Sequence, residues 1–152
     1  MADKGKLMIT DFGRDGKPIC YNVQDCDYEF IKPVDSNYKP CADVKGGIIN
    51  FTLLSDNEED LNFHNWMLNI GEAHLGWFEL PVTAGIARGG KPKTKAVQFV
   101  GAYCVRLSEY FSNNNAEQMH MRITIVAPII QFSENTKFVN NAIDYTYIPL
   151  GI

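Results

Sequence analysis

The stretch FVGAYCVRLSEYF, residues 99 to 111, alternates along its length but presents apolar residues on both of its faces. The odd positions carry one set of mainly apolar side chains: Phe99, Gly101, Tyr103, Val105 and Leu107. The even positions also begin apolar: Val100, Ala102 and Cys104. Side chains of a strand point alternately to opposite sides, so a strand with one face in water should carry polar residues on that face. Both faces of this strand should therefore be shielded from water by other parts of the protein or by a partner.

The same stretch is long for a strand. Fully extended it would span roughly 43 Å at about 3.3 Å per residue, whereas strands usually have about five or six residues. We therefore expect it to bend or to pass between two sheets. The following strand, 119 to 127, has one apolar face and one polar face with His120, Arg122 and Thr124. That polar face should be wet.

One short helix is predicted between the strands. Residues 55 to 58 read Ser-Asp-Asn-Glu, the pattern of a capping box, with acids Glu58, Glu59 and Asp60 in the expected first turn. Phe63, Trp66, Met67 and Ile70 follow at helical spacing, and we expect the helix to end near Gly71. Such a stripe is typical of core packing.

The remaining segments predict strands and loops. Strands are expected at 17–30, 47–56, 74–82, 95–111 and 119–132. Within the first, the apolar parity changes from Val23 to Cys26, which predicts a β-bulge near Gln24 and Asp25. Residues 31–47 contain Pro33, Pro40 and a glycine pair and show no periodicity, so they form a long loop. One helix among long curved strands favours a mainly β fold, a small barrel or sandwich.

Composition bounds the function. The chain has 152 residues, a net charge of −4 and 45% hydrophobic residues, which fits one globular domain and argues against a nucleic-acid partner. We expect no membrane insertion and no signal peptide, hence assembly in the cytoplasm. The four cysteines show no zinc spacing, so we expect no metal and no cofactor.

Gly85 to Lys91 has the spacing of a phosphate-binding loop, but Pro92 replaces the required hydroxyl and strand-like sequence follows. We find no catalytic constellation and predict no enzyme.

Several motifs, in order, resemble one family. They are Cys26-Asp27-Tyr28-Glu29-Phe30, Val44-Lys45-Gly46-Gly47, the helix with Trp66-Met67, Ala102 to Val105, Ser108 to Phe111, and the strand MHMRITIVAP. Over about residues 17 to 133 the chain resembles the tube protein of type VI secretion systems, the haemolysin-coregulated protein family (Hcp, TssD), and most of all its Bacteroidetes branch. The loop at 81–95 and an apolar tail depart from that pattern. The tail carries Ile143, Tyr145, Tyr147, Ile148 and Leu150 and either adds a strand or docks on a neighbour.

The resemblance implies a curled β-barrel of two sheets with one short α-helix packed alongside. It implies one tube domain over 1–152, with a core of about 7–133 and an extension at 134–152. One face of the 99–111 strand would fill the core, and the apolar start of the other would lie under the helix or against a neighbouring subunit. The polar face of the 119–127 strand would line the lumen or face solvent.

The implied function is structural. Hexameric rings would stack into a hollow tube, expelled from the cell with effectors when a sheath contracts, with sheath, spike and effector proteins as partners. The candidate stacking contacts are the loop residues Asp35, Tyr38, Lys39, Pro40 and Lys45. They rest on the length of this loop and on the extended loop of the family.

Three other functions remain open at this point. The chain could be the tube protein of a phage-like contractile injection particle, which shares this architecture. It could be a monomeric β-barrel with a ligand in an apolar interior. It could also be a hydrolase with an unrecognised His and Cys or Ser site, which would require a low-pKa thiol or an activated hydroxyl.

Overall fold

The computed structural model describes residues 5–10, 12, 17–55, 60–69, 73–82, 93–111 and 119–140. Four features named above lie wholly or largely outside these residues: the Gly85–Pro92 loop, the apolar tail from Ile143 to Leu150, residues 56–59 of the expected helix start, and the expected helix end at Ile70 and Gly71.

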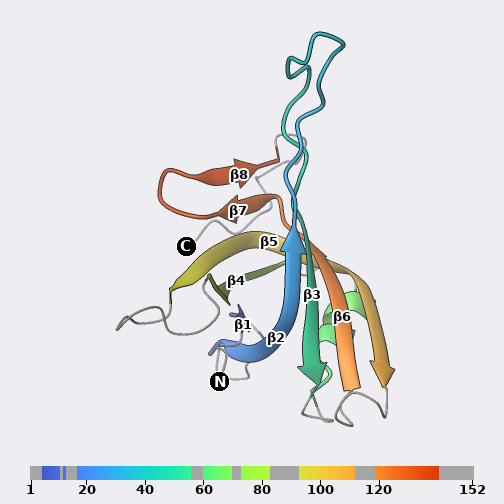
Figure 1. Ribbon diagram of the computed structural model, residues 1–152. Helices are drawn as coiled ribbons and strands as arrows, with labels where there is room; N and C mark the ends of the chain where they lie inside the picture. The colour runs from blue at the N-terminus through green and yellow to red at the C-terminus, as the bar shows by residue number, and fades with distance from the viewer. Residues whose placement is uncertain are drawn as a thin grey trace.

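The chain folds into a closed six-stranded barrel with a β-hairpin added to it (Figure 1). The elements are β1 (Gly5–Ile9), β2 (Ile19–Tyr28), β3 (Ile48–Ser55), α1 (Asn62–Leu68), β4 (His74–Pro81), β5 (Thr94–Phe111), β6 (Met119–Val126), β7 (Ile129–Gln131) and β8 (Lys137–Val139). The strand order is β4-β1-β2-β3-β6-β5, and pairing of β4 with β5 closes the ring. All of these neighbours are antiparallel. The prediction of a mainly β, curled barrel with one short helix is confirmed.

Strand β5 is the element on which closure depends. Its first part, residues 94 to 102, pairs with β4, and its last part, residues 103 to 111, pairs with β6. Where β6 ends, β7 continues the pairing at Val100, Phe99 and Gln98. Figure 1 shows β5 curving across the barrel from one side to the other. The long strand thus bends, as its length predicted.

Two bulges in β5 explain why both of its faces look apolar. Between His74 and Gly76, β4 advances two residues while β5 advances three, from Ala102 to Phe99, with Gly101 at a positive φ of 69°. Between Ile125 and Thr124, β6 advances one residue while β5 advances two, from Cys104 to Arg106. Each extra residue exchanges the inward and outward faces.

The core-facing side chains of β5 therefore change parity along the strand: Val97, Phe99, Ala102, Cys104 and Leu107. Ala102 and Cys104, expected under the helix or a neighbouring subunit, belong to the same buried cluster as Phe99, and that cluster also contains the helix residues Phe63 and Trp66. Tyr103 and Val105, expected inward, are instead about half exposed, at 46% and 49%.

The predicted bulge in β2 is confirmed. The register with β3 shifts between Val23 and Asp25, which is where the apolar parity of the sequence changes. Before the bulge Val23 is buried in the core, and after it Cys26 and Tyr28 pack against the core.

The barrel interior is filled by side chains from all of its strands. Phe51, Phe78 and Phe99 are fully buried, and the Phe78 ring lies 5.2 Å from Phe51 and 6.5 Å from Phe99 between centroids. Strand β1, which the sequence reading did not predict, contributes Leu7 and Ile9, both fully buried. It is a short strand buried along nearly its whole length, so it carries no alternation to detect.

The helix is shorter than predicted and begins later. It starts at Asn62, its N-cap residue Leu61 makes no side-chain capping hydrogen bond, and its first turn holds no acid. The capping box at 55–58 is therefore wrong, because Ser55 still belongs to β3 and pairs with Met119. The predicted stripe is confirmed in part: Phe63 and Trp66 are buried and Met67 packs against the core.

Strand β8 lies inside the segment expected to extend beyond the core. It pairs with β7, and Phe138 at its centre is buried in the core cluster. Residues 137–139 of the expected extension thus pair with the sheet, and Phe138 packs in the core.

At Gly76, in the strand that closes the barrel, there is no room for a side chain. A Cβ at this position would lie 2.4 Å from the Met8 carbonyl oxygen and 2.6 Å from the Phe99 ring. We predict that Gly76→Ala lowers the free energy of unfolding by about 1–3 kcal/mol, because a backbone atom and a buried ring must both move. Gly5→Ala is the matched control, since its Cβ would meet neighbours only at 3.1 Å and beyond. Urea unfolding at a fixed protein concentration measures both, and equal stabilities would contradict this account of closure.

Candidate assembly surfaces

A two-stranded arm, residues 31–47, projects from one end of the barrel between β2 and β3 (Figure 1). Ile31 and Lys45 exchange backbone hydrogen bonds of 2.9 and 2.7 Å, and the Cys41 N–H donates to the Pro33 carbonyl at 2.9 Å. Single bridges pair Ile31 with Lys45 and Val34 with Pro40. The aperiodic loop of the sequence is therefore an ordered arm with few ladder bonds.

The tip of the arm is a turn organised by Asp35. One carboxylate oxygen of Asp35 accepts the backbone N–H of Asn37 at 2.8 Å and that of Lys39 at 3.0 Å. The Asp35 N–H donates to the Lys39 carbonyl, and the Tyr38 N–H donates to the Asp35 carbonyl. Tyr38 has a positive φ of 63°, the only such non-glycine residue in the described ranges, and is 88% exposed. The turn presents this ring to solvent.

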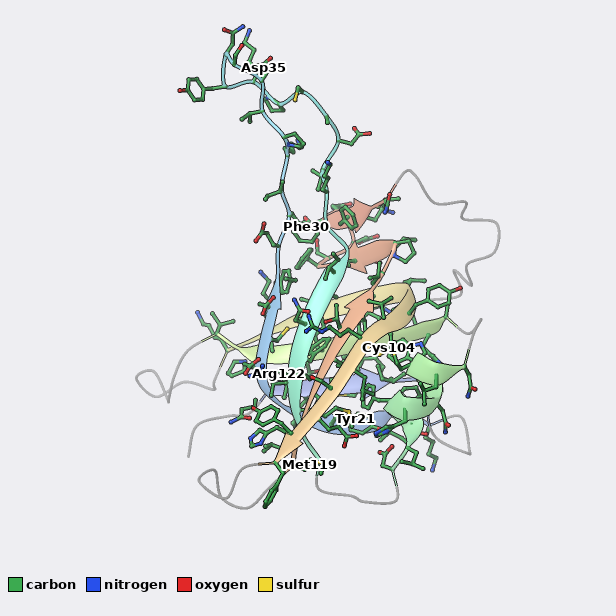
Figure 2. The ribbon with its side chains drawn as sticks, turned by 90° about the vertical axis from the view of Figure 1, so that its right-hand side faces the viewer. Tyr21, Phe30, Asp35, Cys104, Met119 and Arg122 are labelled. Carbon is green, nitrogen blue, oxygen red and sulfur yellow. The ribbon has the colours of Figure 1, made fainter. Side chains whose placement is uncertain are left out.

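The structure brings together four of the five predicted stacking residues. Asp35, Tyr38, Lys39 and Pro40 lie at or beside the tip, whereas Lys45 lies at the foot of the arm opposite Ile31. Figure 2 shows Asp35 far from the barrel and Phe30 where the arm joins it.

The foot of the arm packs in an aromatic cluster made of Tyr28, Phe30, Phe132 and Phe138. The Phe30 centroid lies 5.2 Å from that of Phe138, 5.8 Å from Phe132 and 6.0 Å from Tyr28. Aromatic pairs at these separations attract beyond their area of contact. The cluster joins the foot of the arm to the β7–β8 hairpin, a link that no local sequence pattern indicates.

Two glycines let the arm return to the barrel next to this cluster. A Cβ at Gly46 would lie 2.5 Å from the Phe30 ring. Gly47 has a φ of 95°, and its carbonyl accepts the Ala127 N–H at 2.7 Å. Only glycine fits both requirements without strain.

A groove of about 870 Å³ lies between the foot of the arm and the β7–β8 hairpin. Its lining combines aromatic rings, Phe30, Phe132 and Phe138, with lysines. Lys32, Lys45 and Lys137 line it together with one acid, Asp43. Lys95 lies nearby, with its ammonium 5.2 Å from the Phe132 ring centroid.

A polar surface crosses the outer side of four neighbouring strands, β2, β3, β6 and β5. It forms a shallow pocket of about 300 Å³ with two acids, Asp25 and Asp27, and two bases, Arg106 and Arg122. Within it Asn50 donates to Asp27 at 2.9 Å, and the Thr124 hydroxyl donates to the Asn50 side-chain oxygen at 2.6 Å. Its polar groups are thus partly satisfied within one subunit.

His120 departs from the expected wet face. It is only 4% exposed, because the Tyr110 ring stacks on it at 5.0 Å with an interplanar angle of 11°. The Arg122 guanidinium lies 5.0 Å from the same Tyr110 ring on its way to solvent. Arg122 is exposed and Thr124 half-buried, so the prediction of a wet face holds for Arg122.

An apolar row lies on the same outer side, nearer the arm. Ile48 pairs with Val126, which in turn pairs with Tyr103, so the three residues stand side by side across β3, β6 and β5. Ile48 is 52% exposed and Tyr103 46%. Adjacent exposed apolar side chains of this kind commonly mark contact surfaces.

The helix is tied to the barrel by polar contacts at its start. The Tyr21 hydroxyl donates to Asp60 at 2.8 Å, Asn62 donates to the Tyr21 oxygen at 3.2 Å, and the Asn62 N–H donates to Asp60 at 3.0 Å. Burial raises the pKa of Tyr21 well above its usual range, and the neighbouring Asp60 adds to the increase. Within the first turn of the helix, His64 contacts the Glu109 carboxylate of β5.

Two of the four cysteines, Cys26 and Cys104, do not suit nucleophilic catalysis. Burial raises the pKa of Cys26 to about 12, with added repulsion from Asp27 and Asp25, and burial raises the pKa of Cys104 to about 11. Both are protonated thiols at neutral pH. Within the ranges that the structure describes, no three His, Cys, Asp or Glu side chains are grouped to hold a metal ion. In the same ranges, no helix is long and apolar enough to cross a membrane.

Comparison with known proteins decides the family. The family "Hemolysin coregulated protein Hcp (TssD)" matches residues 1–141. The chain belongs to the Hcp family. The sequence resemblance is thereby confirmed, and so is the predicted role as a tube subunit of type VI secretion.

Solved Hcp structures share this fold. Hcp1 from Flavobacterium johnsoniae superposes with a TM-score of 0.70 at 23% identity, over 91% of this chain and 100% of that chain. Hcp1 from the E. coli EAEC 042 pathovar gives 0.65 at 12% identity, over 88% of this chain and 95% of that chain. A comparison with curated proteins found no match. At these identities the superpositions establish the fold of an Hcp barrel.

We predict that thiol reactivity separates the four cysteines of this Hcp protein. Cys20 and Cys41 are exposed, so they should react with a maleimide within minutes at pH 7.5. Cys26 and Cys104 should react at least about a hundredfold more slowly, because their raised pKa leaves little thiolate. Their rates should rise as the pH approaches their pKa values. Mass spectrometry of labelled peptides measures these rates. Fast labelling of Cys104 at neutral pH would contradict the prediction and support the alternative of a hydrolase with a low-pKa thiol.

Proposed function

We propose that this Hcp protein forms hexameric rings that stack head-to-tail into the hollow inner tube of a type VI secretion system, and that it has no enzymatic activity. The observation that carries the proposal is the ordered arm on the end of a filled, closed barrel. A tube subunit needs one pair of complementary surfaces for the ring and a second pair for stacking. A projecting arm supplies one surface of the stacking pair.

The arm suits an axial contact because its order does not depend on a partner. Two-stranded ribbons are marginally stable alone in water. Here the aromatic cluster at the foot and the Asp35 turn at the tip stabilise both ends of the ribbon. Axial stacking through Asp35, Tyr38, Lys39 and Pro40 is the role we propose for the tip.

We propose that ring closure covers the apolar row of Ile48, Val126 and Tyr103. Tyr103 belongs to the strand whose second apolar face required a cover, and it stays half exposed in the single subunit. A neighbouring subunit would remove this surface from water at a gain of about 25 cal/mol per Å².

The polar surface of Asp25, Asp27, Arg106 and Arg122 is our candidate lining for the lumen. Its two acids and two bases balance, and Asn50 and Thr124 already hydrogen-bond within the subunit. Such a surface offers passing effectors few unsatisfied groups to bind. Passage out of the cell, and contacts with sheath, spike and effectors, belong to the same proposal.

The filled interior argues against the rival of a ligand-binding barrel. Among the residues that the structure describes, the rings of Phe51, Phe78 and Phe99 are fully buried and pack against one another in the interior, where a ligand would have to bind. A sizeable apolar cavity is required for that function.

The proposal predicts the state of the purified protein. Light scattering and negative-stain microscopy should show hexameric rings with a central hole, and short stacks at high concentration. A monomer at every concentration tested would contradict the proposal and favour a role for the subunit alone.

Reversing the charge of the arm should separate stacking from ring formation. We predict that Lys39→Glu with Lys45→Glu keeps the rings and reduces stacking. Lys6→Glu with Lys17→Glu is the matched control, because it makes the same charge change at exposed positions outside the arm. Unchanged stacking in the arm variant would show that the arm is not part of the axial interface.

A further inference from the structure

The groove beside the β7–β8 hairpin is positively charged on a chain that is negative overall. Three lysines and one aspartate line it: Lys32, Lys45, Lys137 and Asp43. The whole chain has a net charge of −4. In the ranges that the structure describes, none of the three ammonium groups forms an ion pair within the subunit. The groove therefore offers positive charge to an anionic partner.

Aromatic rings form the apolar part of the same groove. The Phe30 centroid lies 5.2 Å from that of Phe138 and 5.8 Å from that of Phe132. Phe30 is nevertheless 36% exposed, and Phe132 is half-buried. A ligand that carries both apolar and anionic groups would match the two parts of the lining.

Strand β8 runs along this groove and is the last strand of the sheet. Its three residues, Lys137, Phe138 and Val139, all line the groove. Among the described strands, β8 pairs with β7 alone. Figure 1 shows the hairpin of β7 and β8 beside the foot of the arm.

Two backbone hydrogen bonds show which groups of β8 are used within the hairpin. The Phe132 N–H donates to the Thr136 carbonyl at 2.9 Å, and the Asn140 N–H donates to the Pro128 carbonyl at 2.8 Å. In an antiparallel ladder, hydrogen-bonded pairs recur at every second residue. Phe138, midway between Thr136 and Asn140, therefore directs its N–H and C=O toward β7.

The backbone groups of Lys137 and Val139 consequently point away from β7, toward the open edge of the sheet. No backbone hydrogen bond from another described residue reaches them on that side. An edge strand with unpaired backbone groups is a template for pairing with an extended segment.

We infer that this groove binds an extended segment of another protein that alternates acidic and apolar residues, and that the segment adds to β8 as a further strand. Its backbone pairs with Lys137 and Val139. Because side chains alternate along a strand, its apolar residues lie against the aromatic rings while its acids face the lysines. The inference concerns the surface of one subunit, goes beyond the proposed function and does not depend on ring formation.

A synthetic peptide tests this inference on the full-length protein. The probe is a fluorescent heptapeptide of alternating aspartate and valine with blocked ends. Fluorescence anisotropy should show saturable binding that weakens as salt is raised, because the lysines are at the surface. The same peptide with lysine in place of aspartate should bind at least about tenfold more weakly. Equal binding of the two peptides would overturn the inference.

Charge reversal in the groove provides matched variants. Lys32→Glu with Lys137→Glu should weaken binding of the aspartate–valine probe about tenfold or more, because two attractions become repulsions. Lys6→Glu with Lys17→Glu makes the same charge change at exposed positions outside the groove and should leave binding unchanged. An equal loss in both variants would show that net charge alone attracts the probe, and would overturn the site.

Two readouts distinguish strand addition from electrostatic attraction. On binding, the amide hydrogens of Lys137 and Val139 should exchange more slowly, whereas that of Phe138 should change little because it already bonds to β7. A probe N-methylated on its valines and one N-methylated on its aspartates should differ in binding, because one set of N–H groups faces β8. Binding that survives both methylations, or that leaves exchange unchanged, would overturn strand addition.

Other occupants of the groove are recognisable without the probe. If the amide hydrogens of Lys137 and Val139 are already protected in the free protein, another part of the chain or a second copy covers this edge, and the inference is wrong. A change of mass in light scattering for Lys32→Glu with Lys137→Glu would identify a second copy as the occupant. Probe binding to a protein that forms no rings would contradict the proposed function alone, and rings that bind no probe would contradict this inference alone.

Discussion

Closure of the sheet by one long strand is the constraint on which the rest of this structure depends. Without the pairing of β5 to β4, both strands would present unpaired backbone groups along an open edge. Strand β5 reaches β4 with its first half and β6 with its second, and the two extra residues bend it between them. The same bulges keep apolar side chains turned toward one core along a strand whose parity changes twice. Gly76 permits the close approach of β4 to Met8 and Phe99 that this bend requires.

The sequence predicted the fold class because the signals for it are periodic and extended. The change of parity at Val23 and Cys26 revealed the β2 bulge, since apolar residues continue in the new register. In β5, apolar residues occupy both odd and even positions. This pattern is the same for a strand with two bulges as for a regular strand that is buried on both faces, so the sequence did not reveal the bulges. Strands β1 and β8 are too short to show a period. The acids before the helix matched a capping pattern, but pairing of Ser55 in the sheet overrode that local preference.

The candidate surfaces were predictable only where they are local in sequence. Four of the five residues proposed for stacking cluster at the tip, because a single turn joins them, whereas Lys45 belongs to the foot of the arm. The aromatic cluster under the arm joins Tyr28 and Phe30 to Phe132 and Phe138. Contacts between distant segments follow from strand register, and the register of β5 depends on two bulges that the sequence concealed.

The fixed arm has a thermodynamic consequence for association. A segment that becomes ordered only on binding loses its conformational entropy at that moment, which weakens the complex. In this protein the Asp35 turn and the aromatic cluster order the arm when the chain folds, so that loss belongs to folding and not to contact between subunits. The heat capacity change of association should therefore reflect the surfaces that meet, with no added contribution from folding of the arm. Subunits with such an arm can join and separate as rigid bodies.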